Sequence, residues 1–436
     1  MKISIKKFRI KRKLIATLAE WHFFGNPSKK LKIVGVTGTN GKTTVATLLY
    51  KVATSLGYKA GLISTVENLI AGERIIHSET APQTTPDPIY LNKLLKKMVQ
   101  KGCQYVFMEV SSHALDQNRV AGIKFTGGIF TNLTHDHLDY HKSLENYFRA
   151  KKKFFEMLPK DAFALSNADD DHGEAILDGI KAEKFFYGIL DVGHQDSQMS
   201  DVWKNFNGRI LKLDFSGLEL NFNGQKVISK LLGKFNAYNL LSVWSTCKLL
   251  NFDMVKVNKI LEGIEPPRGR FDYYVSQNGV IVIVDYAHTP DALEKVLLTI
   301  KEVLPTFGGK IFENDPPKAG RIISVFGCGG DRDSSKRPKM GKIGASLSDI
   351  AIFTSDNPRS EDGDKIIDNM KNDLIHEETK KVITILDRRL AIEEAVEIAQ
   401  KGDIILCAGK GHEDYQEIKG VKSHFNDMEE FKKILK

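Results

Sequence analysis

The chain has 436 residues, of which 42% are hydrophobic and 27% charged, and its formal net charge is +8. It is too long for one ordinary domain of ~100–200 residues, and its composition is that of a soluble globular protein, so we expect two or three domains. No apolar run approaches the ~20 residues of a membrane span, and the basic first residues lack the apolar core of a signal peptide. The scattered cysteines form no C-x-x-C pair, which argues against a disulfide framework and a zinc site: Cys103, Cys247, Cys328 and Cys407. We therefore expect a cytoplasmic protein.

The first thirteen residues include seven Lys or Arg. Such a segment is compatible with an arm that touches nucleic acid or anionic lipid, but no aromatic interleaving and no nucleic-acid motif accompany it. We interpret residues 1–30 as a short, solvated basic segment. We accordingly expect no nucleic-acid partner and no membrane insertion.

A glycine-rich stretch at residues 31–44, LKIVGVTGTNGKTT, links a predicted strand to a predicted helix. The common phosphate loop, G-x-x-x-x-G-K-[ST], would require glycine at position 36, where this chain has Val36. The context is still that of a phosphate site, because loop N–H groups and a helix N-terminus both attract anions. We expect Lys42 to contact the outer phosphates of a nucleoside triphosphate and Thr43 to bind Mg²⁺. The alternative is a tight strand–helix turn without a ligand.

Further buried strands are predicted at Tyr105–Ser112 and Gly127–Thr134, and a helix with a serine start at Ser143–Leu158. Glu109, near the end of the first of these strands, is a candidate Mg²⁺ ligand. A capped helix start with a satisfied histidine explains the residues around it equally well. The stretch THDHLDYH at Thr134–His141 combines three histidines with two aspartates, which favours a metal or phosphate site over a solvated loop. No cysteine or H-E-x-x-H motif accompanies it, so zinc is not indicated.

From Gly208 to Val227, alternating apolar and polar residues around an Asn-Gly turn predict antiparallel hairpins. The Pro/Gly-rich stretch Glu265–Arg270 marks a candidate boundary, so we assign residues 31–268 to a central domain and 269–436 to a C-terminal domain. Strands and helices alternate regularly beyond it, which is typical of a parallel sheet with helices on both faces. The predicted fold class is α/β: a P-loop-type ATPase domain with a parallel sheet and antiparallel hairpins, followed by a Rossmann-like domain.

Four polar loops follow strands of the C-terminal domain: DYAHTPDAL, FGCGGDRDSSKRP, SDNPRSED and AGKGHEDYQ. Ligands bind beyond the carboxyl ends of parallel strands, so these loops are expected to form one site. Their basic side chains could bind anions: Arg332, Lys336, Arg337 and Arg359. Their acidic and amide side chains could bind ammonium or hydroxyl groups of a ligand: Asp285, Asn357 and Glu413. Helix capping is the alternative explanation, and we expect it for Ser334 and Asp362.

From about residue 31 to its end, the chain resembles the Mur ligase family. TGTNGKTT resembles the ATP loop of that family, which departs from the common spacing in the same way. MEVSSHAL, TNLTHDHLDYH, DYAHTPDAL, FGCGGDRD…KRP, DNPRSED and GKGHEDYQ resemble its UDP-N-acetylmuramoyl-tripeptide synthetases. The resemblance implies an ADP-forming ligase of peptidoglycan precursor synthesis. ATP would phosphorylate a peptide carboxylate on a nucleotide sugar, and the amine of an amino acid would then displace phosphate to form an amide.

The resemblance also implies roles for individual residues. The ATP loop would be Gly38, Thr39, Asn40, Gly41, Lys42, Thr43 and Thr44. Thr43 and Glu109 would hold one Mg²⁺, and His137 a second one together with a carbamylated lysine. Alignment places that lysine at Lys151, with Lys152 as the alternative; Lys42, His137 and Lys151 would form the catalytic set. Adenine and ribose would lie between the two domains, near Asn236, Arg270, Asp285 and His288.

Two substrates are implied, a nucleotide-sugar dipeptide and an amino acid. Residues matching the family's positions for the first are Thr84, Thr85, Ser112 and Arg119. Residues matching its positions for the second are Arg332, Asp356, Asn357, Pro358, Arg359, Gly409 and Glu413. In this branch the arginine of DNPR accompanies meso-diaminopimelate, whose distal carboxylate suits a guanidinium fork. The resemblance therefore favours diaminopimelate over lysine.

The family carries a uridine-binding domain ahead of the ATP loop, whereas about thirty residues precede the loop here. That difference favours a sister hypothesis, a ligase acting on another carrier of folate or polyglutamate type, while DNPR and GKGHEDYQ oppose it. A non-catalytic ATP-binding module is a further alternative, but it would be expected to lack Lys42, Glu109, His137 or the lysine, and all are present. We expect the protein to act as a monomer.

Overall fold

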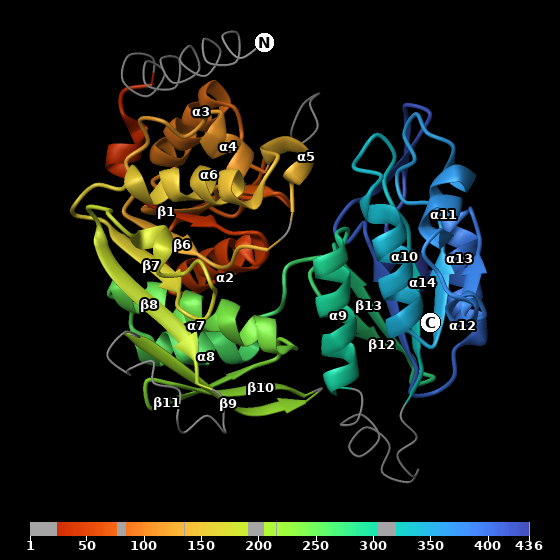
Figure 1. Ribbon diagram of the computed structural model, residues 1–436. Coiled ribbons are helices and arrows are strands. Elements are labelled where there is room, and N and C mark those ends of the chain that lie inside the picture. The colour runs from red at the N-terminus through yellow and green to blue at the C-terminus, as the bar shows by residue number, and fades with distance from the viewer. Residues whose placement is uncertain are drawn as a thin grey trace. The chain divides into compact units, whose positions relative to one another are not determined.

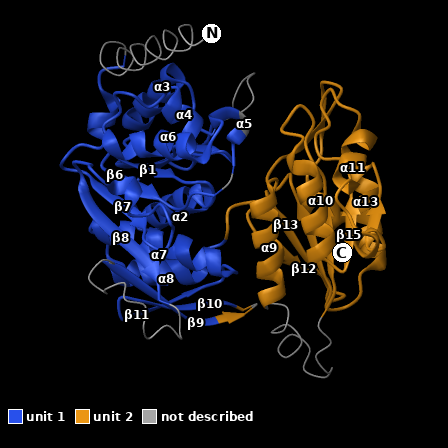
Figure 2. Ribbon diagram, viewed as in Figure 1, with its two compact units in different colours: residues 1–212, 217–265 blue, residues 213–216, 266–436 orange. Residues whose placement is uncertain are grey.

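The computed structural model describes residues 24–75, 84–134, 136–190, 205–214, 216–303 and 320–435. Most of the basic segment expected at the N-terminus, and His135 of the THDHLDYH motif, lie outside the described residues. The chain forms two units, one of residues 1–212 and 217–265 and one of residues 213–216 and 266–436 (Figure 2). No helix in the described ranges is long and apolar enough to cross a membrane.

An eleven-stranded sheet forms the centre of the first unit (Figure 1), in the order β11-β10-β9-β8-β7-β6-β1-β5-β2-β3-β4. Its strands are β1 (Lys32–Thr37), β2 (Ala60–Ile63), β3 (Asn68–Ile70), β4 (Glu73–Arg74), β5 (Tyr105–Glu109), β6 (Gly127–Phe130), β7 (Phe163–Asn167), β8 (Glu183–Ile189), β9 (Phe206–Asp214), β10 (Gly217–Phe222) and β11 (Gln225–Ser229). The strands from β9 to β2 in this order pair in parallel. β10 and β11 form an antiparallel hairpin, as do β2 and β3.

The first unit also contains the helices α2 (Lys42–Ser55), α3 (Pro88–Gln100), α4 (Ser112–Asp116), α5 (Leu138–His141), α6 (Leu144–Glu156), α7 (Lys234–Leu249) and α8 (Met254–Gly263), with short 3₁₀ turns at Pro27–Lys30 and Ala175–Leu177. Ser143 caps α6 by accepting a hydrogen bond from the Asn146 N–H, which confirms the predicted serine start. α6 packs very closely on β1, because a Cβ added at Gly35 would lie only 2.5 Å from the ring of Phe154. This contact fixes α6, and Lys151 with it, beside the loop that follows β1.

The second unit contains a six-stranded sheet in the order β12-β13-β17-β14-β15-β16 and a separate hairpin, β18–β19. Its elements are β12 (Asp272–Val275), β13 (Ile281–Asp285), α9 (Pro290–Val303), β14 (Ile322–Phe326), α10 (Lys336–Leu347), β15 (Ile350–Phe353), α11 (Gly363–Lys371), α12 (His376–Thr379), β16 (Val382–Thr384), α13 (Arg388–Ile398), β17 (Ile404–Ala408), β18 (Tyr415–Ile418), β19 (Val421–His424) and α14 (Asp427–Ile434). All neighbours in the large sheet are parallel except β12, which runs antiparallel to β13. Its core includes Val284, Val325, Ile405, Ile392 and Phe431, all buried.

The predicted α/β class, with a parallel sheet, antiparallel hairpins and a second α/β unit, is confirmed. The predicted Asn-Gly turn joins β10 to β11 with both residues at positive φ, as a tight two-residue hairpin requires. Asp362 caps α11 as expected, but the residue at the start of α10 is Ser335 rather than Ser334, and its side chain makes no capping bond. The antiparallel strand β12 and the hairpin β18–β19 were not predicted.

Candidate functional site

The glycine-rich loop lies between β1 and α2 and is held by residues that follow β6. Gly38 and Gly41 have φ angles of +152° and +85°, which residues other than glycine rarely adopt. A Cβ on Gly38 would lie 1.9 Å from Thr131 Oγ1, so the loop approaches the neighbouring strand end closely. The Asn40 N–H donates to Asn132 Oδ1 at 2.9 Å, and Thr131 Oγ1 donates to the Asn40 carbonyl at 2.6 Å. These contacts fix the loop in a conformation that only its glycines permit.

Two lysine side chains meet at this loop. Lys42 Nζ donates to the carbonyls of Gly38 and Thr39, at 3.1 and 2.8 Å, and Lys151 Nζ donates to the same Gly38 carbonyl at 2.6 Å. Burial, and then the positive charge of Lys42, hold the pKa of Lys151 well below its usual value. Thr43 and Thr44, also predicted for this site, lie buried in the first turn of α2. Lys42 therefore lies beside the N-terminus of α2, an arrangement that suits a phosphate group.

Glu109 lies at the carboxyl end of β5 and pairs in register with Val36 of β1. Its two carboxylate oxygens accept hydrogen bonds from Thr65, from the backbone N–H at 2.8 Å and from the hydroxyl at 3.2 Å. The hydroxyls of Thr65 and Thr84 lie 3.0 Å apart, and the hydroxyl of Thr85 donates to the Glu109 carbonyl at 2.9 Å. Of the predicted substrate-binding threonines, Thr85 therefore contacts the predicted Mg²⁺ ligand directly, and Thr84 is connected to it through Thr65.

Arg119 and Ser112 complete the polar groups of this side of the unit. Arg119 donates from a terminal guanidinium nitrogen to the Thr85 carbonyl at 2.8 Å. The hydroxyl of Ser112 lies 3.0 Å from Nε2 of His141, which comes from the THDHLDYH motif. The four residues predicted to hold the nucleotide-sugar dipeptide thus belong to one part of the structure.

His137 has a left-handed backbone conformation at the start of α5, and its ring lies 3.5 Å from the carboxylate of Asp136 and packs against His113. Burial lowers its pKa to about 4; Asp136 opposes this shift, while His113, Lys42 and Lys151 reinforce it. The imidazole is therefore neutral at pH 7, the form that binds metal ions.

The residues at the phosphate loop and at the end of β5 fit a nucleoside triphosphate with Mg²⁺. Glu109 and Thr43 offer oxygen ligands, and Mg²⁺ is commonly held by one or two carboxylates together with substrate phosphates. No group of three or more His, Cys, Asp or Glu that could hold a metal by itself occurs in the part of the chain that the structure describes. In Mg²⁺ sites of this kind, substrate phosphates supply part of the coordination shell.

Asn236, predicted near the adenosine, lies on α7 in the same unit. Its side-chain oxygen accepts from Asn239 Nδ2 at 3.0 Å, and its Nδ2 donates to the Leu232 carbonyl at 2.8 Å. Asn239 Oδ1 would lie 2.6 Å from a Cβ on Gly41, so α7 contacts the phosphate loop closely. Asn239, like Thr65 and Asn132, was not predicted from the sequence.

The other three residues predicted for adenosine lie in the second unit, at the end of β13. Asp285 accepts a hydrogen bond from the Phe271 N–H at 2.7 Å, and burial raises its pKa to about 6. The guanidinium of Arg270 lies 4.8 Å from the ring centre of Tyr286. His288 Nδ1 lies 2.8 Å from the Tyr286 carbonyl. The structure brings these three residues together around one tyrosine.

The DNPR loop after β15 and the GKGHE loop after β17 meet in the second unit. Asn357 Nδ2 donates to Glu413 Oε2 at 2.8 Å, and the Asp356 carbonyl accepts from Gln416 at 2.9 Å. Gly409 has a φ angle of +112°, and a Cβ on it would lie 2.7 Å from Asp356 Oδ2. The predicted amino-acid site is therefore one continuous cluster at the carboxyl edge of the sheet.

The arginines of this edge differ in their partners. Arg359 donates to the Gly330 carbonyl at 2.7 Å, and its Nε lies 3.9 Å from a carboxylate oxygen of Glu417. Arg332 is exposed. Arg337, which the sequence offered for anions, donates from one guanidinium nitrogen to both carboxylate oxygens of Glu361, at 2.8 Å each. Arg359 and Arg332 are thus the arginines of this set that remain candidates for a substrate anion. Pro358, between Asn357 and Arg359, contributes its carbonyl to the loop by accepting from the Glu361 N–H at 3.0 Å.

Comparisons with known proteins identify the family of the chain. The Mur ligase middle domain matches residues 36–247, and the Mur ligase glutamate ligase domain matches residues 269–411. The chain belongs to the Mur ligase family. Mur ligases use ATP and Mg²⁺, which the phosphate loop and the oxygen ligands beside it fit.

The chain is 50% identical over 413 residues to the UDP-N-acetylmuramoyl-L-alanyl-D-glutamate–2,6-diaminopimelate ligase of Parabacteroides distasonis, with 95% of this chain and 79% of that protein covered. A solved structure of a ligase with that name is 31% identical, with a TM-score of 0.62 over 97% of this chain and 82% of the other. Mycobacterium tuberculosis folylpolyglutamate synthase, solved with ADP and AMPPCP, gives a TM-score of 0.68 at 16% identity over 91% of this chain and 92% of the other. That last likeness shows the fold alone.

Proposed function

We propose that this protein is an ATP-dependent, ADP-forming ligase that joins meso-diaminopimelate to UDP-N-acetylmuramoyl-L-alanyl-D-glutamate in peptidoglycan precursor synthesis. The observation that carries the choice of amino acid is the DNPR loop, in which Arg359 lies two residues after Asn357, the hydrogen-bond partner of Glu413. The 50% identity to the Parabacteroides distasonis ligase over 95% of the chain supports the proposal.

In the proposed reaction the γ-carboxylate of the dipeptide attacks the γ-phosphorus of ATP, and the bond to the ADP oxygen breaks. The amine of diaminopimelate then attacks the acyl carbon, phosphate leaves, and the amine loses a proton. Catalysis of the first step consists mainly of positioning and of neutralising charge on the phosphates. Lys42 and the N–H groups of the first turn of α2 would perform this task, since a helix N-terminus and a lysine ammonium both attract phosphate oxygens.

We assign Thr43 and Glu109 to a first Mg²⁺ and His137 and Lys151 to a second one. A lysine cation cannot bind Mg²⁺, but attack of its neutral amine on CO₂, with loss of a proton, gives a carbamate with two oxygen ligands. The structure favours Lys151 over Lys152 for this modification. Lys151 is 1% exposed and contacts the phosphate loop, whereas Lys152 is only half-buried and donates to the Ala175 carbonyl.

The remaining assignments follow the clusters. Thr84, Thr85, Ser112 and Arg119 would hold the nucleotide-sugar dipeptide, beside Glu109 and the phosphates. Asn236, Arg270, Asp285 and His288 would contact adenosine. We expect the protein to act as a monomer.

In the second unit, Arg359 and Arg332 would bind the distal carboxylate of diaminopimelate, because a guanidinium matches a carboxylate in both shape and charge. Asp356, Asn357, Gly409 and Glu413 would hold its amino group and the adjacent carboxylate. The polar atoms of all four lie in the cluster formed by the two loops.

Product mass is the direct test. The protein is incubated with ATP, Mg²⁺ and the UDP-linked dipeptide, with diaminopimelate and lysine supplied together. A product that carries diaminopimelate is expected. A lysine product would keep the ligase class but contradict the role of Arg359. ATP hydrolysis without product would favour a different carrier, such as a folate or polyglutamate substrate.

A further inference from the structure

Lys410, the second residue of the GKGHE motif, has an unusual environment for a lysine. Its relative exposure is 0%, although lysines are rarely fully buried without a partner. Its Nζ donates to Asn357 Oδ1 and to Glu413 Oε2, each at 3.2 Å. The ammonium therefore lies between two residues that we assign to the amino-acid substrate, and it belongs to neither the substrate set nor the phosphate site.

The hydrogen bonds around Lys410 determine the orientation of the Asn357 amide. Asn357 Oδ1 accepts from Lys410 Nζ and also from the Glu417 N–H at 2.9 Å, while Nδ2 donates to Glu413 Oε2 at 2.8 Å. Rotating the amide by 180° would place its NH₂ group against two donors and its oxygen against a carboxylate. Lys410 is one of the two donors that exclude this alternative.

Lys410 also determines which oxygen of Glu413 is available. Among the described residues, the Glu413 carboxylate accepts hydrogen bonds from Asn357 and Lys410, and both use Oε2. The Glu413 side chain is 17% exposed, so it is not sealed from a ligand. Oε1 keeps its lone pairs for another donor, and an amino-acid ammonium is a donor of complementary charge.

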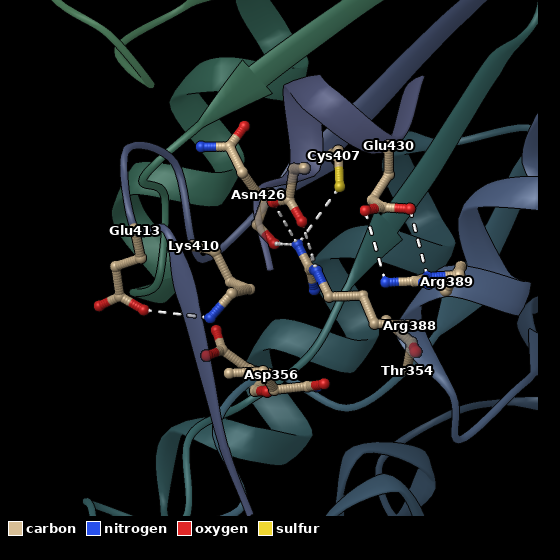
Figure 3. A network of polar contacts seen from close by, with 12 residues as sticks. Thr354, Asp356, Arg388, Arg389, Cys407, Lys410, Glu413, Asn426 and Glu430 are labelled. Carbon is tan, nitrogen blue, oxygen red and sulfur yellow. Dashed lines mark hydrogen bonds and ion pairs between the residues drawn. The ribbon is translucent and has the colours of Figure 1, made fainter. Parts of the chain in front are cut away.

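The base of this loop is held rigidly. Arg388, at the start of α13, donates to both carboxylate oxygens of Asp427 at 2.8 Å and to the Ala408 carbonyl at 3.0 Å. Figure 3 shows Arg388 with its hydrogen bonds, and Lys410 with its side chain directed toward the carboxylate of Glu413. Because Ala408 ends β17, the strand end from which Lys410 projects cannot shift without breaking its hydrogen bond to Arg388, which a fully buried ion pair holds in place.

We propose that Lys410 is a positioning residue for the amino-acid substrate: its buried ammonium orients the Asn357 amide and holds Glu413 with Oε1 directed to the ammonium of the incoming amino acid. This inference rests on the proposed function, because it takes the cluster of Asn357 and Glu413 as the amino-acid site.

The test compares K410M, K410Q and the wild type in steady-state kinetics with each substrate varied in turn. Methionine retains the length of the side chain and removes both its charge and its donors, whereas glutamine keeps an NH₂ donor without the charge. K380M is the matched control, because Lys380 forms an exposed i,i+3 pair with Glu377 at 2.8 Å, just before β16 at the edge of the sheet. Thermal unfolding of each variant reports its stability.

We expect K410M to raise KM for diaminopimelate by about 10- to 100-fold, the range for one or two hydrogen bonds of a charged group. KM for ATP and for the UDP-linked dipeptide should stay within about twofold, a split that a general loss of structure would not produce. K410Q should lie between K410M and the wild type, and K380M should match the wild type.

An unchanged KM for diaminopimelate in a folded K410M, or an equal rise for all three substrates, would overturn the inference and leave the proposed function intact. Failure of both K410M and K410Q to fold would also overturn it, since the lysine would then serve the fold. A wild-type protein that ligates no amino acid at all would instead overturn the proposed function, and this inference with it.

Discussion

Replacing Lys151 with methionine is expected to lower activity strongly and to change the stability of the fold very little. The Lys151 side chain makes a hydrogen bond to the Gly38 carbonyl at 2.6 Å and lies 4.2 Å from the ring centre of Tyr147. Methionine retains most of this packing, and the Gly38 carbonyl still accepts from Lys42 at 3.1 Å, so no buried acceptor is left without a partner. Removing a buried charge whose desolvation is costly offsets the lost bond, and we expect the free energy of unfolding to change by less than about 1 kcal/mol.

Activity should respond very differently. If Lys151 supplies a charged ligand at the site of phosphoryl transfer, its loss removes about 3–4 kcal/mol of transition-state stabilisation, or ~10²- to 10³-fold in kcat. ADP release and tripeptide formation measure this effect, and K152M is the control, because Lys152 is only half-buried and donates to the Ala175 carbonyl rather than to the phosphate loop. Nuclear magnetic resonance of protein equilibrated with isotopically labelled bicarbonate should show a carbamate signal that K151M lacks and K152M retains. A K151M variant with kcat within threefold of the wild type would refute the reasoning.

Three further predictions concern single side chains. R359M should lower kcat/KM for diaminopimelate by about 100-fold, as expected for the loss of charged hydrogen bonds, and leave any slow use of lysine unchanged in a competition assay; an equal loss for both amino acids would contradict the assignment. Because burial raises the pKa of Asp285 to about 6, the folded state holds more protons than the unfolded state between about pH 4 and 6, and stability falls as pH rises through that range. D285N should remove this fall and be more stable than the wild type at pH 7 by about 1–3 kcal/mol in urea unfolding, whereas a parallel pH profile in the variant would count against it. In G38A, the new Cβ would lie 1.9 Å from Thr131 Oγ1, at a residue whose φ is +152°. We therefore expect this variant to lower the free energy of unfolding by about 1–3 kcal/mol and to abolish ATP turnover. Retention of ADP release by G38A would contradict this prediction, because it would show that the loop adapts to the side chain.

The parts of the molecule that could be predicted from the sequence are those whose functional residues follow one another along the chain. The phosphate loop could be recognised because strand, glycines, lysine and helix follow one another within fourteen residues. The alternation of strands and helices likewise predicted the second unit, because it depends on patterns a few residues long. β12 and β18–β19 were missed, since four-residue strands at an edge or in a hairpin carry little periodic signal.

Residues that support the site from distant parts of the chain were not found. Asn132 and Thr65 contact the phosphate loop and Glu109 only because β6 and β2 are placed beside β1 and β5 in the sheet. Composition alone did not decide which of the three consecutive lysines at residues 151–153 would carry the carbamate. A signal did exist: residue 151 lies four positions after Tyr147 and three before Phe154, so helical spacing places it on the buried face of α6.

Lys151 and Lys410 show why burial alone does not define the role of a lysine. Both are almost fully buried, but the acceptor of Lys151 is an uncharged backbone carbonyl, while Lys410 faces a carboxylate. Converting Lys151 to a carbamate would replace a buried cation near Lys42 by an anion, which improves the local charge balance. The same change at Lys410 would place a second anion against Glu413, which low-dielectric surroundings penalise strongly. The acceptor that the fold provides therefore separates a lysine suited to modification from one suited to holding a substrate-binding carboxylate in place.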